Sequence, residues 1–371
     1  MDDTTRGFRS AVAPGKSLRS RGMLHGSEGP AEPSPGPFSS LDLDGLAPVD
    51  IARAARSPRP VIDYVIPGML SGSVAVMVGP GGVSKSMLAL QTAAVVGTGL
   101  DHWSLWTDNQ AVPRGRVAVF NVEDPPVILQ ARVHDIAAST AIRPSELEEF
   151  IDAFHDHVDI WPLSGRGFAF GRKQKTGRIL PTEWIEWLEQ RVEGVRLAVF
   201  DTFIRGLDGL DENSSTEVAP VLAMLEAICR RRGVTFLILH HVNKASGAPG
   251  AAASQQAARG SSALTDNARW QTNLATMSDA EAQARGVPSD ERRRWVQVEL
   301  SKCNYGAPLE GRWLNRGDGG VLYGAVQPSA APPQSSAKGK PGGRANGHAG
   351  LAAPRGPVPT GPDAIDLKIR W

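Results

Sequence analysis

The sequence predicts an α/β fold: a mostly parallel sheet covered by helices on both faces, with antiparallel strands at its C-terminal end. Two observations predict it. Short runs rich in β-branched residues recur along the chain, and longer segments with apolar residues three and four positions apart lie between them. The predicted strands are 73–78, 116–122, 196–200, 234–239, 269–276 and 294–300, and the predicted helices are 85–96, 126–138, 182–192 and 216–231.

The composition indicates one large domain between two flexible ends. The chain has 371 residues, of which 41% are hydrophobic and 21% charged, which suffices for one large α/β domain but not for a second. Residues 1–45 and 328–371 are rich in Ser, Pro and Gly and lack periodicity, so we expect both to be disordered. The domain should therefore span residues 46–327.

Composition also bounds the cellular setting and the partners. Cys229 and Cys303 lack the spacing of a zinc site or a disulfide framework, which fits a reducing cytoplasm. No segment has the apolar length of a signal peptide or a membrane span, so we expect a cytoplasmic protein without membrane contact. The formal net charge is +1, so any nucleic-acid binding must come from local basic patches.

A glycine-rich loop after the first predicted strand carries the most specific chemical signal. Glycines let backbone N–H groups turn toward a phosphate, and the following helix adds its positive end. Lys85 would contact the β- and γ-phosphates of a nucleotide, and the Ser86 hydroxyl would bind Mg²⁺. The predicted nucleotide-binding residues are Gly79, Pro80, Gly81, Gly82, Val83, Ser84, Lys85, Ser86 and Met87.

Ser84 is the main departure from the GxxxxGK[ST] pattern, because it stands where the last glycine is expected. Serine is small, yet its Cβ could alter the geometry of the loop or its affinity for nucleotide. A similar tripeptide lies upstream at Gly15, Lys16 and Ser17, but no apolar strand precedes it. We therefore assign that tripeptide to the disordered end and the phosphate loop to residues 79–86.

Carboxylates at the ends of two predicted strands complete the nucleotide site. Asp201 ends a buried run typical of a Walker B segment, and it would hold Mg²⁺ through water beside Ser86. Glu123 follows another strand, where a carboxylate can orient and polarise the water that attacks the γ-phosphate. Asp124 is the competing candidate for that role. Because Asp124 precedes Pro125, it could equally cap the N-terminus of a helix.

Two histidines follow the predicted strand 234–239. At the carboxyl edge of the sheet, one of them could sense the γ-phosphate of a bound nucleotide. His241 or His240 would fill this role, and we expect one to be the sensor and the other a structural partner.

Five motifs in order resemble the RepA-like branch of the RecA/DnaB-type ATPases, which are ring-forming replicative helicases. The resemblance covers residues 60–323 and implies a RecA-like P-loop NTPase core with ATP and Mg²⁺ at subunit boundaries. It also implies a homo-oligomeric ring, usually of six subunits, that translocates on single-stranded DNA and unwinds duplexes in plasmid or related replication. The motifs are GGVSKSMLAL from Gly81, VEDPP from Val122, VFD from Val199, LHH from Leu239 and RGSSALTDNARW from Arg259.

A ring of this kind needs a positive group from the neighbouring subunit to stabilise charge on the transferred phosphoryl group. The candidates are Arg259, Arg269 and Lys302, of which Arg269 is the first choice. Lys302 resembles the lysine of the finger hairpin in this superfamily. Asn304 replaces the second cation of the related Lys-x-Arg pattern, which puts a two-cation finger in doubt. A solvated ion pair is an equally good interpretation of each residue alone.

Loops that line the channel of such a ring would contact DNA. Segment 243–258, with Lys244 near its start, resembles the mobile DNA-binding loop of RecA-like proteins, and the loop 205–215 is a second candidate. The basic run 172–178 could neutralise phosphates, although a solvated hairpin is the more common structure for such a run. No separate primase or DNA-recognition module is evident, so a primase or initiator protein would have to supply those functions.

Two functions of different classes follow from these observations. The first is an ATP-dependent, DNA-translocating helicase. The second is a RecA-like ATPase that uses nucleotide-driven assembly as a regulatory or loading switch without unwinding DNA.

Overall fold

The computed structural model describes residues 47–241, 262–306 and 311–325, and it divides into two units between Val61 and Ile62. The described part of the first unit holds one short helix, α1 (Ile51–Arg56), none of whose residues is buried. The Asp50 carboxylate caps this helix by accepting the Arg53 backbone N–H at 2.9 Å. The predicted disordered segments 1–45 and 328–371 lie outside the described residues.

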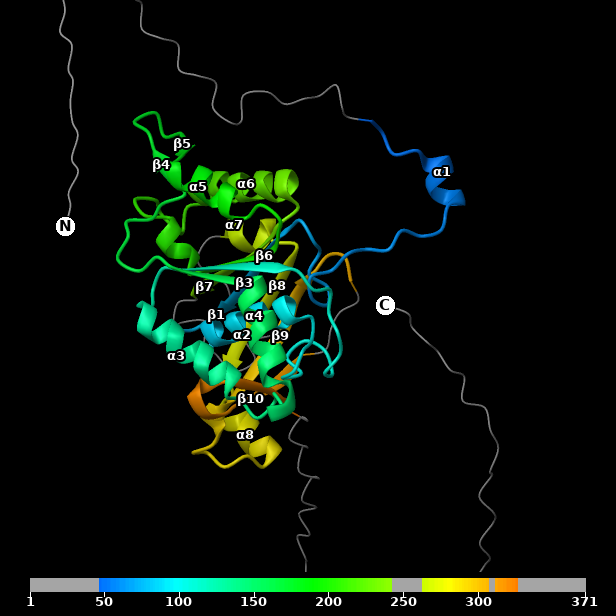
Figure 1. Ribbon diagram of the computed structural model, residues 1–371. Helices are drawn as coiled ribbons and strands as arrows, with labels where there is room; N and C mark the ends of the chain where they lie inside the picture. Colours follow the sequence, from blue (N-terminus) through cyan, green and yellow to red (C-terminus); the bar gives the residue numbers. More distant parts are fainter. Residues whose placement is uncertain (1–46, 242–261, 307–310, 326–371) are drawn as a thin grey trace, which may run out of the picture. The chain divides into compact units, whose positions relative to one another are not determined.

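A nine-stranded sheet in the order β11-β10-β9-β8-β1-β7-β6-β2-β3 forms the centre of the second unit (Figure 1). Strands β8, β1, β7, β6, β2 and β3 run parallel, and β9, β10 and β11 continue the sheet antiparallel. The predicted α/β fold with antiparallel C-terminal strands is therefore confirmed. The strands are β1 (Val74–Gly79), β2 (Arg116–Asn121), β3 (Val158–Pro162), β6 (Val195–Asp201), β7 (Thr235–His241), β8 (Trp270–Thr276), β9 (Trp295–Cys303), β10 (Arg312–Arg316) and β11 (Leu322–Ala325).

Helices cover both faces of this sheet, as predicted. Figure 1 shows α5, α6 and α7 on one face and α3 and α4 on the other, with α2. The predicted helices correspond to α2, α3, α5 and α6. The helices of this unit are α2 (Lys85–Thr98), α3 (Pro126–Ala137), α4 (Leu147–His157), α5 (Glu183–Arg191), α6 (Ser215–Arg232), α7 (Ser262–Asn267) and α8 (Asp279–Arg285).

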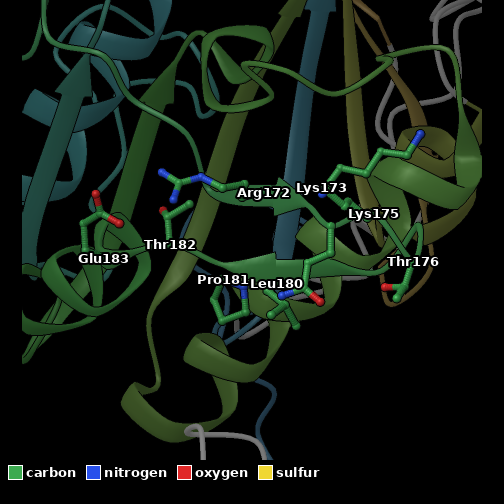
Figure 2. A pocket seen from close by; sticks show the side chains of 9 residues that line it. Arg172, Lys173, Lys175, Thr176, Leu180, Pro181, Thr182 and Glu183 are labelled. Carbon is green, nitrogen blue, oxygen red and sulfur yellow. The ribbon is translucent and has the colours of Figure 1, made fainter. Parts of the chain in front are cut away.

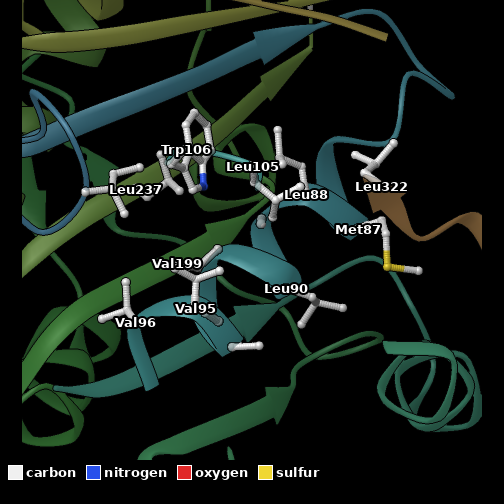
Figure 3. Packing of buried hydrophobic residues seen from close by; sticks show 14 of the residues in the cluster. Met87, Leu88, Leu90, Val95, Val96, Leu105, Trp106, Val199, Leu237 and Leu322 are labelled. Carbon is white, nitrogen blue, oxygen red and sulfur yellow. The ribbon is translucent and has the colours of Figure 1, made fainter. Parts of the chain in front are cut away.

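Successive residues of the central strands enter different hydrophobic cores. In β2, Val117 and Val119 pack with α2 and α4, while Ala118 and Phe120 pack with α5 and α6. Side chains of a strand alternate between the faces of the sheet, so a strand covered on both faces must be apolar throughout. This is why these strands are continuous apolar runs in the sequence. Figure 3 shows the first core, in which Val95 and Val96 of α2 lie near Val199 of β6.

Three strands of the sheet were not among the predicted ones. β3 lies at one edge and β10 and β11 at the other, where only part of each strand is buried. Half-buried edge strands carry polar residues and are short, so they lack the apolar run that identifies a central strand. Helix α4, which was also not predicted, leads directly into β3 and buries Phe150 and Phe154.

The loop between α2 and β2 is organised by one buried carboxylate. Asp101 accepts the backbone N–H groups of Leu105 at 2.9 Å, Trp106 at 2.7 Å and Thr107 at 2.8 Å. These bonds satisfy three donors that the loop would otherwise bury without partners. They also direct the Trp106 indole into the core, where its N–H donates to Thr92 of α2 at 3.0 Å. No helix within residues 47–241, 262–306 and 311–325 has the length and apolar character to cross a membrane.

We predict that Asp101→Ala lowers the free energy of unfolding by about 3 kcal/mol, because three buried N–H groups lose their acceptor. Chemical denaturation followed by circular dichroism measures the change. Asp108→Ala is the matched control, since the Asp108 side chain in the same loop is 90% exposed. A stability equal to that of wild type for Asp101→Ala would show that the loop does not depend on this carboxylate.

Candidate functional site

The carboxyl ends of four parallel strands bring the predicted site residues to one edge of the sheet. In the register of the strands, Gly79 at the end of β1 pairs with His241 of β7, and Asn121 of β2 pairs with Asp201 of β6. The strand order β1-β7-β6-β2 makes these four ends neighbours. This is the edge at which open α/β sheets bind ligands.

The phosphate loop, residues 79–86, connects β1 to α2 as predicted. Gly79 must be glycine, because a Cβ there would lie 2.9 Å from the Leu274 carbonyl oxygen. Gly82 has φ 76°, in the left-handed region. Ser84 also lies in that region, with φ 74° and ψ 24°, immediately before α2 begins. The serine therefore adopts the backbone conformation that a glycine would adopt at this position.

Lys85 is buried at the centre of the site. Its ammonium donates to the carbonyl oxygens of Gly79 at 2.7 Å and Pro80 at 3.0 Å, and its Nζ lies 3.1 Å from His241 Nδ1. Burial lowers the pKa of Lys85 to about 8, while the negative charges of Asp201 and Glu123 act in the opposite direction. The ammonium therefore depends on these carboxylates to remain charged inside the protein.

Asp201, at the end of β6, is buried beside Ser86 and Asn121. Burial raises the pKa of Asp201 to about 6; the hydrogen bond from the Ser86 hydroxyl lowers it, and the charges of Glu123 and Asp124 raise it. The Asn121 amide donates to Asp201 Oδ2 at 3.0 Å. A serine hydroxyl and a carboxylate at bonding distance are oxygen ligands of the type that Mg²⁺ shares with nucleotide phosphates. The residues present thus fit the predicted magnesium site.

Asp124 and Glu123 have different surroundings. The Asp124 carboxylate forms an ion pair with Arg132 at 2.6 Å and accepts the Asn121 amide at 3.3 Å. The interpretation of Asp124 as a helix cap is wrong, because Pro125 occupies the N-cap position of α3 in an extended conformation and no side chain caps the helix. Asp124 is held by structural contacts, whereas Glu123 faces the strand ends. This favours Glu123 as the residue that would orient water.

The two histidines of β7 separate into a buried and an accessible residue. His240 is buried, and burial, together with the charges of His241 and Lys85, lowers its pKa to about 4. Its Nδ1 has no hydrogen-bond partner within the described chain. His240 is therefore a neutral packing residue. His241 is less buried and lies among the charged groups of the site.

His241 lies between Lys85 and Glu123. Because an ammonium only donates, His241 Nδ1 accepts from Lys85, and the ring proton is then on Nε2, 3.7 Å from Glu123 Oε1. The pKa of Glu123 is lowered by this contact with His241 and by the charges of Arg205 and Lys85, although partial burial raises it. A displacement of the Lys85 ammonium would therefore be felt at Glu123 through one imidazole ring.

Asn121 is a site residue that the sequence interpretation did not select. Besides its amide bonds to Asp201 and Asp124, its carbonyl oxygen accepts the backbone N–H groups of Glu123 at 3.2 Å and Asp124 at 2.7 Å. One amide thus fixes the loop that carries Glu123 and ties it to β6. The signal in the sequence is a single polar residue at the end of a buried strand, which does not indicate its partners.

Arg269 and Lys302, here called the cation pair, are not part of this cluster. The Arg269 backbone N–H donates to Val74 at the start of β1, at 3.4 Å, and Lys302 donates to the Asp266 carbonyl oxygen at 3.0 Å. Burial and the positive charge of Arg269 lower the pKa of Lys302, so the two cations are close together. Arg259 and the predicted DNA loop 243–258, with Lys244, lie outside the described residues.

The basic run 172–178 forms the predicted hairpin, between β4 (Gly171–Lys173) and β5 (Ile179–Pro181). Lys173 pairs with Glu217 of α6 at 2.5 Å. The Phe170 N–H donates to the Gly206 carbonyl oxygen at 2.8 Å, which joins the hairpin to the loop after β6. Figure 2 shows a pocket along this hairpin that is lined by Arg172, Lys173, Gln174, Lys175, Thr176, Leu180, Pro181, Thr182 and Glu183.

Two solved structures resemble this fold. The chain is similar to the RadB recombinase, with 12% identity and a TM-score of 0.41 over 69% of this chain and 92% of that one. It is also similar to a helicase ATPase domain, with 13% identity and a TM-score of 0.45 over 68% of this chain and 84% of that one. The sheet order and the phosphate loop define the chain as a RecA-like P-loop ATPase. Residues 42–247, more than half of the chain, match the family model described as AAA domain, and the chain belongs to that family.

We predict that Asp201→Asn stabilises the nucleotide-free protein at neutral pH. A carboxyl whose pKa rises from 3.8 to about 6 on folding adds stability below pH 3.8 that is lost as the pH rises through about 6. The stability gap between Asp201→Asn and wild type should therefore widen with pH across this window. At 1.36 kcal/mol per pH unit it can reach roughly 3 kcal/mol.

Urea denaturation of both proteins at a series of pH values, without nucleotide or Mg²⁺, tests this expectation. Asp208→Asn, an exposed carboxylate in the loop after β6, is the matched control. A gap that stays constant from pH 4 to pH 7.5 would mean that Asp201 is not destabilised by ionisation.

We predict that Asn121→Ala lowers kcat for ATP hydrolysis by about 10- to 100-fold, because Glu123 and Asp201 lose the amide that positions them. The KM for ATP should change much less, since the phosphate loop is untouched. Steady-state kinetics measure both constants, with the exposed Asn213→Ala as control. An unchanged kcat would remove Asn121 from the site.

Proposed function

We propose that the chain is an ATP-dependent DNA helicase of the RepA-like branch, which forms a ring and translocates on single-stranded DNA. The observation that carries the proposal is the separation of two charged groups. Lys85, Glu123, Asp201 and His241 gather at one edge of the sheet, and the cation pair lies at the opposite edge.

The chemistry of the first group supports ATP hydrolysis. Ser86 and Asp201 would hold Mg²⁺, which when bound neutralises charge on the β- and γ-phosphates. Lys85 would move its hydrogen bonds from the loop carbonyls to the phosphates. The Glu123 carboxylate, whose pKa is lowered, can accept a hydrogen bond from the attacking water. His241 would then transmit the position of Lys85 to Glu123.

The position of the cation pair supports a site shared between subunits. Arg269 contacts Val74, and Gly79 lies five residues further along β1, a distance of roughly 16 Å for a strand. An arginine side chain cannot cross that distance to the phosphates of its own subunit. In a ring, however, the cation pair of one subunit can face the phosphate loop of the next and stabilise the transferred phosphoryl group.

DNA would be contacted on the side of the sheet where the strand-end loops lie. The loop 205–215 follows Asp201 directly, and backbone hydrogen bonds join it to the β4–β5 hairpin with its cationic side chains. A change at Asp201 is therefore transmitted to both segments through few bonds. In replication, a primase or initiator protein would supply priming and origin recognition.

We expect ATP hydrolysis to be stimulated by single-stranded DNA and a forked duplex to be separated in an ATP-dependent reaction. Lys85→Ala should abolish nucleotide binding. Glu123→Gln should retain binding but lower kcat by about 10²- to 10⁴-fold, the usual effect of losing a general base. Glu193→Gln, whose side chain is 73% exposed, should behave as wild type.

The same measurements contradict the proposal in one case. Hydrolysis that ignores DNA, with no strand separation at any protein concentration, excludes a helicase and favours a loading or regulatory ATPase. Normal hydrolysis by Glu123→Gln would instead leave the helicase in place and assign the water-orienting role to another residue.

A further inference from the structure

A second cation, Arg316, lies at the phosphate loop and was not selected from the sequence. β10 is antiparallel to β9, and β9 is antiparallel to β8, so β10 runs in the same direction as β1. Its last residue, Arg316, therefore reaches the edge at which β1 ends. There its Nη2 donates to the carbonyl oxygen of Gly82, in the middle of the loop, at 3.1 Å.

The Arg316 side chain is held in a costly position. Burial lowers the pKa of its guanidinium, and its buried Nε finds no hydrogen-bond partner among the described residues. A buried N–H without a partner costs about 1–3 kcal/mol. The described contact that the guanidinium makes with the loop is the bond to Gly82. That bond is the observation that a role for Arg316 must explain.

The hairpin that carries Arg316 is fixed to the helix that follows the loop. The buried Gln91 side chain in α2 donates to the Leu322 carbonyl oxygen and accepts the Leu322 N–H, both at 2.9 Å. In the turn between β10 and β11, Gly319 has φ 63°, and a Cβ there would clash with the side chain of Asp135 of α3. The turn thus packs against α3, so Arg316 extends to the loop from a rigid support.

The loop needs such a support because of Ser84. A side-chain-bearing residue in the left-handed region costs about 1–2 kcal/mol relative to glycine. Lys85 holds the inner side of the loop through the Gly79 and Pro80 carbonyls, but these are the bonds that it would exchange for phosphate. The bond from Arg316 to Gly82 does not use Lys85. It can hold the loop while the lysine binds substrate.

We propose that Arg316 is a positioning residue that holds the phosphate loop in its nucleotide-binding shape and offsets the strain at Ser84. This inference rests on the part of the proposed function in which the loop binds ATP. It does not depend on DNA unwinding or on the ring.

The test is a double-mutant cycle between Arg316 and Ser84 on the full chain. Arg316→Met keeps the length of the side chain and removes its donors, so we expect the Kd of a fluorescent ATP analogue with Mg²⁺ to rise about tenfold, with kcat at saturating ATP retained. Arg316→Lys should recover part of the affinity. In the Ser84→Gly background, Arg316→Met should raise the Kd by less than threefold.

Arg312→Met is the matched control, because Arg312 lies at the other end of β10 and donates to Ser104 at 3.2 Å, away from the loop. It should bind the analogue as wild type does. Wild-type affinity in Arg316→Met, or an equal loss with and without Ser84→Gly, would overturn the inference alone. A wild-type protein that binds no nucleotide would contradict the proposed function itself. Binding without DNA unwinding would leave the inference supported by the cycle.

Discussion

The buried ammonium of Lys85 is the interaction on which the site depends. It lies among the ends of separate strands, bonded to carbonyls of the β1 end and to His241 of β7, and it is stabilised by the carboxylates of Asp201 and Glu123. A buried cation is tolerated only with such partners. Because these residues are far apart in the chain, only parallel strands that end at one edge can bring them together.

The same arrangement explains why the polar site does not weaken the core. The central strands are apolar on both faces along their length, and polar side chains appear where the strands end. At that edge Asn121 satisfies two carboxylates and two backbone N–H groups with one amide. The cost of gathering like charges is thereby reduced by hydrogen bonds that the fold itself provides.

The sequence predicted the parts of this molecule that local patterns define. The phosphate loop is contiguous, and the continuous apolar strands end in Asp201, His241 and the segment before Glu123, so these positions could be read directly. Asn121 and Arg316 could not, because their roles depend on partners that lie 80 and 234 positions away. Asp124 was misread as a cap because Pro125 starts α3 one residue later. The edge strands β3, β10 and β11 are too short and polar to identify from the sequence.

The paired hydrogen bonds between Gln91 and Leu322 have a consequence for how the protein folds. The side-chain amide lies in the helix after the phosphate loop, and its backbone partner comes 231 positions later, in the last described strand. Until that strand is in place, the amide sits in an apolar core with no partner. A contact of such long sequence separation forms late and slows folding. During synthesis, the nucleotide site would therefore reach its final form only after the ribosome has released almost the whole domain.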